Sequence, residues 1–244
     1  MRTGGRRAER DGAAFGPGAP PAGQTAPAAA DADGDAEPRW QAVIAVVATG
    51  GLYVALPPGL TVGPRWWFPV VVGLLLVTTI ATHRRRYHHI DRVLGFIVTS
   101  LITTQMIVSV VLLVGALPAH EEPANDLLLS ATSLWLTNVL VFALWYWRLD
   151  AGGPHGRESR SAHTGGAFLF PQMTMSRESQ AAAGFERWSP NFVDYLFLAF
   201  TTSTAFSPTD TPALARWAKV LMMLQSIISL AVLALLAARA VNIL

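Results

Sequence analysis

The sequence predicts an all-α, polytopic helical membrane protein with about six membrane segments, the fifth of them short or re-entrant. Of its 244 residues, 52% are hydrophobic and only 14% are charged, and the mean hydropathy is +0.37. The apolar residues gather in runs long enough to cross a bilayer, which is typical of a multi-pass protein. Cysteine is absent, which excludes disulfides, thiolate metal sites and a cysteine nucleophile.

Two domains are expected. Residues 1–38 contain arginines, an Ala/Pro/Gly stretch and an acidic run ending at Glu37, with almost nothing apolar to bury, and predict a disordered cytoplasmic tail. Residues 39–244 form the helical membrane domain: 39–147 hold four transmembrane helices, 148–190 a polar cytoplasmic loop and 191–244 a pore-like C-terminal helix pair. The six apolar runs of this domain are Trp40–Leu56, Trp66–Thr82, Val93–Leu117, Leu127–Trp147, Phe192–Phe206 and Ala213–Leu244.

The first four runs are expected to cross the membrane. The first ends at Pro57 and Pro58, which cannot continue a helix, and the second opens with two tryptophans suited to the bilayer interface, so together they predict a hairpin. The fourth run ends in Trp145, Tyr146 and Trp147, which predict an aromatic anchor at the bilayer surface.

The last two runs are less regular. After the polar loop, in which the short apolar patch Ala167–Pro171 is expected to dock onto the membrane surface, the fifth run reaches only about 22 Å against a hydrocarbon core of roughly 30 Å. It must tilt, thin the bilayer or re-enter. The sixth run is overlong and carries Arg216 and Lys219 in its first turns, so its start is expected along the interface.

Charge predicts the orientation. The loop between the second and third runs holds four arginines, whereas the next loop holds Glu121, Glu122 and Asp126 without a basic residue. The first loop is therefore expected in the cytoplasm, together with both termini, with six crossings and Ser207–Pro212 outside. Lys219 is the only lysine of an Ala-, Gly-, Pro- and Arg-rich chain, which favours a GC-rich bacterial genome and a location in the bacterial plasma (inner) membrane.

The C-terminal pair resembles a potassium-channel pore module. Residues Ala199–Asp210, AFTTSTAFSPTD, align without a gap with a pore-helix and filter phrase such as SFTTLTTVGYGD. The two filter glycines fall on Ser207 and Thr209, and the tyrosine falls on Pro208. A potassium filter aims successive backbone carbonyls at the ion and uses glycine for left-handed backbone, so the filter is degenerate and conventional potassium conduction is not expected. Leu136–Pro154, Phe168–Met173 and Phe192–Leu244 also resemble an uncharacterised family of bacterial multi-pass membrane proteins.

Candidate site residues are predicted by these patterns. The candidate pore and turn residues are Thr201, Thr202, Ser203, Thr204, Ser207, Thr209 and Asp210. The polar residues within the membrane runs are Gln105, Asn138 and Gln225. Because polar groups at this depth must face protein or water, they line a solute path or bond neighbouring helices; interhelical bonding is the simpler alternative.

Other sites are not expected. No catalytic signature appears, no cofactor is implied, and the net charge of +2 gives no support to nucleic-acid binding. His83, His88, His89 and Asp91 hold metal-ligand groups, but neighbouring arginines repel divalent cations; anionic lipids are the expected partners of Arg84, Arg85 and Arg86.

Three functional hypotheses of different classes result. The first is a structural or accessory membrane protein, because neither buried charge nor a catalytic motif is visible. The alternative is an ion channel or solute permease lined by the C-terminal Thr/Ser-rich segment, which requires a homo-oligomer because one module cannot close a pore. The third is a membrane enzyme that uses the cytoplasmic histidines.

Overall fold

The computed structural model describes residues 37, 39–84, 88–116, 124–158, 165–185, 188–204 and 210–241, all within the unit formed by residues 36–244. The unit is all-helical; no strand occurs in these ranges, where Phe168 and Ala213 form an isolated antiparallel bridge. Three helices are long and apolar enough to cross a membrane, over Ile90–Gly115, Asp126–Arg157 and Arg216–Ala238. Two shorter apolar helices accompany them, over Trp40–Ala55 and Trp67–Ala81.

The first half of the unit is two antiparallel helix pairs. The helices are α1 (Trp40–Ala55), the 3₁₀ turn η1 (Pro58–Leu60), α2 (Trp67–Arg84), α3 (His88–Ala116) and α4 (Ala124–Leu149). Pro57 and Pro58 end α1 as expected, since a proline has no N–H to continue the helix. In this turn Arg65 donates hydrogen bonds to the carbonyls of Val54, in the last turn of α1, and of Leu56, the residue that follows α1.

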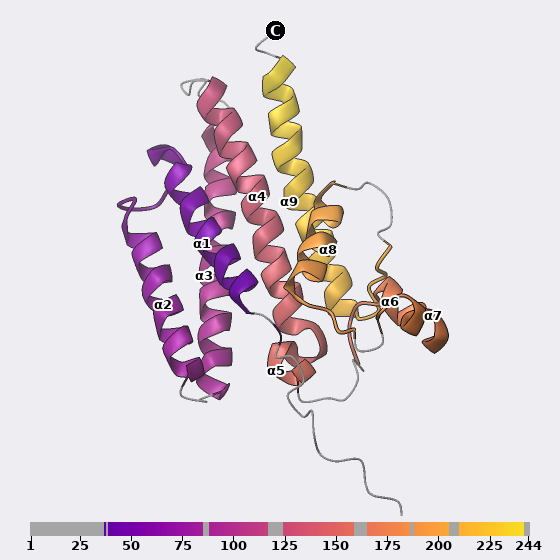
Figure 1. Cartoon of the computed structure of the whole chain (residues 1–244). Helices are drawn as coiled ribbons and strands as arrows, with labels where there is room; N and C mark the ends of the chain where they lie inside the picture. The colour runs from indigo at the N-terminus through magenta and orange to yellow at the C-terminus, as the bar shows by residue number, and fades with distance from the viewer. Residues whose placement is uncertain are drawn as a thin grey trace, which may run out of the picture. The chain divides into compact units, whose positions relative to one another are not determined.

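Helix α4 is the central helix. It packs against α1, α3, α8 (Phe192–Thr204) and α9 (Arg216–Val241) (Figure 1). In its apolar stretch 61% of the residues are buried, against 17% in that of α9. The outer face of α9 is therefore mostly exposed and apolar, as expected of a surface that faces lipid.

Aromatic residues at the end of α4 pack against neighbouring helices, with Tyr146 and Trp147 buried and Trp145 partly buried. Tyr146 is fully buried, Trp147 packs edge to face on Phe192, and Trp145 donates a 2.9 Å hydrogen bond to the Thr103 hydroxyl of α3. The expected aromatic anchor is therefore wrong, because helix packing takes up all three rings.

The segment between α4 and α8 forms a cap on one end of the bundle. It comprises the 3₁₀ turn η3 (Asp150–Gly152), α5 (Gly153–Glu158), α6 (Pro171–Thr174) and α7 (Arg177–Ala182). Phe168 and Phe170, expected to dock onto the membrane, are instead buried against the ring of Tyr195 in α8. Phe168 also packs against Trp217 at the start of α9, with ring centroids 6.0 Å apart.

Helices α8 and α9 run in the same direction. The ring pairs Trp147–Phe192 and Trp135–Phe200 show that α8 runs antiparallel to α4. Both α8 and α9 therefore begin at the end where α4 finishes, as the ribbon also shows (Figure 1).

This arrangement does not confirm the expected six crossings. With α8 and α9 starting at one end of the bundle, α9 finishes at the end opposite to the start of α1 (Figure 1). The physical reason is the antiparallel pairing of residues 167–169 with 212–214, which holds the start of α9 beside the end of α4.

Candidate functional site

The candidate site is the polar network that joins α4, α8 and α9. Gln225 of α9 is fully buried and is its centre. Its Nε2 donates to the Ala199 carbonyl at 2.7 Å and to the Ser203 hydroxyl at 2.8 Å, both in α8. Its Oε1 accepts a 2.5 Å hydrogen bond from the Tyr146 hydroxyl of α4. One amide thus bonds two neighbouring helices at once.

Three further side chains extend the network toward the end of α8. The Ser229 hydroxyl donates to the Ser203 carbonyl at 2.7 Å and accepts from Trp135 Nε1 at 3.1 Å. Asn138 Nδ2 donates to the Gln225 carbonyl at 3.3 Å. Because the last four carbonyls of a helix lack partners within the helix, Ser229 supplies a donor where α8 needs one.

The α8 threonines do not face a common path. The hydroxyls of Thr201, Thr202 and Thr204 each donate to a carbonyl three or four residues earlier in α8 itself. Back-bonding of this kind satisfies a hydroxyl inside an apolar environment without a second helix. Among the candidate pore residues, Ser203 is therefore the one that the structure brings into the network with Asn138 and Gln225.

The remaining predicted residues lie elsewhere. Gln105 is buried in α3, where its Nε2 donates to Ser109, and Ser109 donates to the Leu60 carbonyl of η1. Asp210 is exposed near the start of α9. Ser207, Thr209, Arg85 and Arg86 lie outside the described residues, and Arg84 is the last residue of α2.

A second cluster, which the sequence did not predict, lies at the end of α4. Asp150 is fully buried and accepts a 2.6 Å hydrogen bond from the Tyr195 hydroxyl of α8. Arg157, with a side chain only 2% exposed, binds both carboxylate oxygens of Glu37 at 2.9 and 3.0 Å and donates to the carbonyls of Trp147 and Asp150. Glu37, expected within the disordered tail, is in fact held by this bidentate pair.

The hydrogen bonds of this second cluster join the end of α4 to the start of α8. Glu37 and Arg157 are 120 residues apart in the sequence, so no local sequence pattern predicts their contact. The available signal was the pair of residues that break the helix: Gly152 and Gly153 have φ of +84° and +80°, and Ala151 before them also has a left-handed φ of 50°. Strained backbone of this kind persists only where neighbouring contacts stabilise it, and here those contacts are made by Arg157 and Tyr195.

In the ranges that the structure describes, no group of three or more His, Asp or Glu side chains is placed to hold a metal ion. Asp91 is bound by Arg39 at 3.4 Å and by His155 at 3.1 Å, which makes it part of an ion-paired cluster. What these arrangements do chemically is join helices through hydrogen bonds.

Comparison of the chain with protein families, curated proteins and solved structures finds no match.

Proposed function

We propose that this protein is an integral protein of the bacterial inner membrane with a structural or accessory role, built on α4, α8 and α9. The proposal rests on one observation: the polar atoms of α8 are hydrogen-bonded within the chain. Ser203 and the carbonyls of Ala199, Thr202 and Ser203 are bonded to α9 within the same chain, and the threonine hydroxyls to α8 itself. Polar groups engaged in this way hold helices together and leave few partners for a passing solute.

The proposed topology has five crossings and a re-entrant α8. Helix α8 is 13 residues long, about 20 Å, and its end lies beside Trp135 and Ser229, in the middle of α4 and α9. Helices α1, α2, α3, α4 and α9 cross, and α8 enters and leaves by the end where α4 finishes.

The orientation is deduced from the basic residues. Arg39, Arg92, Arg148 and Arg157 lie at the end of the bundle where α1 and α3 begin and α4 finishes. Arg216 and Lys219, which the six-crossing expectation left on the external side, lie in the first turn of α9 at this same end. Basic residues favour the cytoplasm, so this end is cytoplasmic and α9 finishes outside.

Cysteine labelling tests this topology, because the natural chain has no cysteine. We expect an impermeant thiol reagent to label Leu244→Cys in intact cells, and to label Gly165→Cys and Asp210→Cys only after permeabilisation. Six crossings require the reverse for positions 210 and 244, so labelled Asp210→Cys with protected Leu244→Cys would reject the re-entrant α8.

Flux measurement tests the role itself. A structural or accessory protein, reconstituted into proteoliposomes, should leave the permeability of the vesicles to cations, anions and small neutral solutes at the level of protein-free vesicles. Solute flux well above that level, lost when Gln225 is replaced by leucine, would reject the structural role.

A channel assembled from several copies is the second candidate. It is favoured by the parallel α8 and α9, which is the arrangement of a re-entrant pore helix followed by its last membrane helix, and by the exposed apolar face of α9. A single cysteine at Met223, 58% exposed on α9, should then cross-link two copies in native membranes. Val111→Cys, 63% exposed on α3, is the matched control that should not cross-link. Cross-linking at neither position would remove this candidate.

A further inference from the structure

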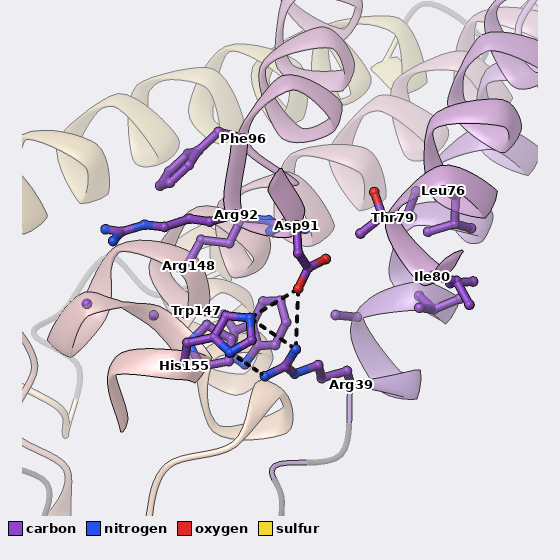
Figure 2. A pocket seen from close by; sticks show the side chains of 16 residues that line it. Arg39, Leu76, Thr79, Ile80, Asp91, Arg92, Phe96, Trp147, Arg148 and His155 are labelled. Carbon is purple, nitrogen blue, oxygen red and sulfur yellow. Dashed lines mark hydrogen bonds and ion pairs between the residues drawn. The ribbon is translucent and has the colours of Figure 1, made fainter. Parts of the chain in front are cut away.

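A cavity of about 90 Å³ lies at the basic end of the bundle, separate from the α4, α8 and α9 network (Figure 2). Its space is enough for roughly six water molecules. Helices α1 and α2 supply an apolar wall, whose residues are Ala42, Val43, Val46, Leu76 and Ile80. Charged and polar residues from the starts of α1 and α3 and the region after α4 supply the rest: Arg39, Asp91, Arg92, Arg148 and His155.

The cavity carries an excess of positive charge. Three arginines and one carboxylate line the cavity, so the formal balance is +2 with His155 neutral. Asp91 is already engaged by Arg39 and His155, as the dashed lines of Figure 2 show, and it also attracts Arg148 electrostatically. One carboxylate thus serves three cations or potential cations, Arg39, His155 and Arg148, whereas Arg92 is exposed and its side chain points away from Asp91 (Figure 2).

Arg148 is the decisive residue. It is partly buried, its guanidinium lies over the Trp147 ring at 5.5 Å, and it is pressed so closely against α3 that a Cβ on Gly95 would lie 1.8 Å from Nη1. Its Nε is enclosed, with no hydrogen-bond acceptor among the described residues. Arg157, nine residues on, has two backbone carbonyls and a carboxylate as acceptors.

An enclosed guanidinium N–H without an acceptor is costly, because a desolvated donor needs a hydrogen-bonded partner. Arginine matches phosphate oxygens in particular, since its planar fork donates two parallel hydrogen bonds. Arg92 lies beside it at the cavity and is itself anchored over the Phe96 ring at 6.0 Å. The lining of the cavity therefore combines Arg148, the neighbouring exposed Arg92 and a hydrocarbon wall.

We propose that this cavity binds the phosphate ester of an anionic phospholipid, with Arg92 and Arg148 as the phosphate ligands and α1 and α2 as the surface for an acyl chain. The apolar wall distinguishes a lipid from a soluble phosphate, which would gain nothing from Val43, Val46 or Leu76. The orientation proposed above determines only that the lipid comes from the cytoplasmic leaflet. The site is distinct from Arg84, Arg85 and Arg86, where lipid contact was expected from the sequence.

Native mass spectrometry of the full chain, released from detergent micelles containing phosphatidylglycerol, tests the proposal. We expect the wild type to retain one phosphatidylglycerol, and to retain phosphatidylcholine much less, because choline offsets the phosphate charge. The double variant Arg92→Gln with Arg148→Gln should retain phosphatidylglycerol at least tenfold more weakly. Arg177→Gln, on the exposed α7, removes the same kind of charge outside the cavity and should bind as the wild type does.

A second variant protects the test against misfolding. Leu76→Trp keeps every arginine and fills the apolar side of the cavity, so it should also lose the bound lipid while circular dichroism and elution volume stay unchanged. Equal retention of phosphatidylglycerol by the wild type and both variants would overturn the proposal. Displacement of the lipid by millimolar inorganic phosphate would also overturn it, by assigning the site to a soluble ligand.

Discussion

The most direct test of the α4, α8 and α9 network is the replacement Gln225→Leu. Leucine has a similar volume and suits an apolar environment, so the change removes hydrogen bonds with little change in packing. Three side-chain bonds are lost, two donated by Nε2 to α8 and one accepted from Tyr146. The Tyr146 hydroxyl, on a fully buried side chain, is left without its acceptor.

The expected magnitude is the sum over these three bonds. A hydrogen bond between membrane helices contributes about 0.6 kcal/mol on average and up to about 1.7 kcal/mol. Three of them amount to about 2 to 5 kcal/mol of the free energy of unfolding. Because two of the three bonds join α9 to α8, we expect α8 to detach from α9 before the other helices separate.

The measurement is reversible unfolding in lipid–detergent micelles titrated with sodium dodecyl sulfate and followed by circular dichroism. Ile227→Ala is the control: Ile227 lies two residues further along α9 and is 65% exposed, so its replacement should change stability by less than about 0.5 kcal/mol. Tyr146→Phe, alone and combined with Gln225→Leu, completes a double-mutant cycle, whose coupling energy should be about 0.5 kcal/mol or more. A Gln225→Leu protein as stable as the wild type would refute the role of the network.

Two further predictions concern the end of α4. Arg157→Ala breaks a buried bidentate pair and should lower the free energy of unfolding by about 3 to 5 kcal/mol. Arg157→Lys should restore little of this loss, because an ammonium group does not reproduce the planar fork that binds both carboxylate oxygens. Equal thermal midpoints for the lysine variant and the wild type would contradict this prediction. Gly153→Ala should cost more than Gly152→Ala in the same unfolding assay. Both glycines have a left-handed φ that costs a side chain about 1 to 2 kcal/mol, but a Cβ at 153 would also lie 2.8 Å from the Arg148 carbonyl, whereas a Cβ at 152 meets open space; equal losses would contradict this.

The helices themselves were largely predictable from the sequence. Each of the six apolar runs contains a helix, and the first ends within a residue of its predicted position because prolines end it. The third helix begins at His88, five residues before the predicted Val93. Apolar residues mark the stretch that lies in hydrocarbon, and a helix extends beyond that stretch wherever its polar residues find partners, as Asp91 does with Arg39 and His155.

The site was predictable in part. Asn138 and Gln225 stood out because an amide deep in an apolar run needs a partner, and the structure supplies one through interhelical bonds. The sequence did not say which helices they join. The pairs Glu37–Arg157 and Asp150–Tyr195 were missed because their partners are far apart along the chain, in segments whose composition predicts a tail and a loop.

Whether α8 crosses the membrane is the point on which the proposed topology departs from the sequence expectation, which favoured six crossings on the distribution of charge. A run of about 22 Å is compatible with crossing and with re-entry, so the connection from α8 to α9 decides between them. Eleven residues separate Thr204 from Arg216, and an extended chain of that length reaches about 36 Å, more than the roughly 20 Å of α8. A short external turn needs far less chain, whereas a return along α8 needs most of it. That return brings Arg216 and Lys219 to the basic end of the bundle, where the positive-inside rule expects them. The proposed re-entry would thus account for both the length of the connection and the position of the two basic residues.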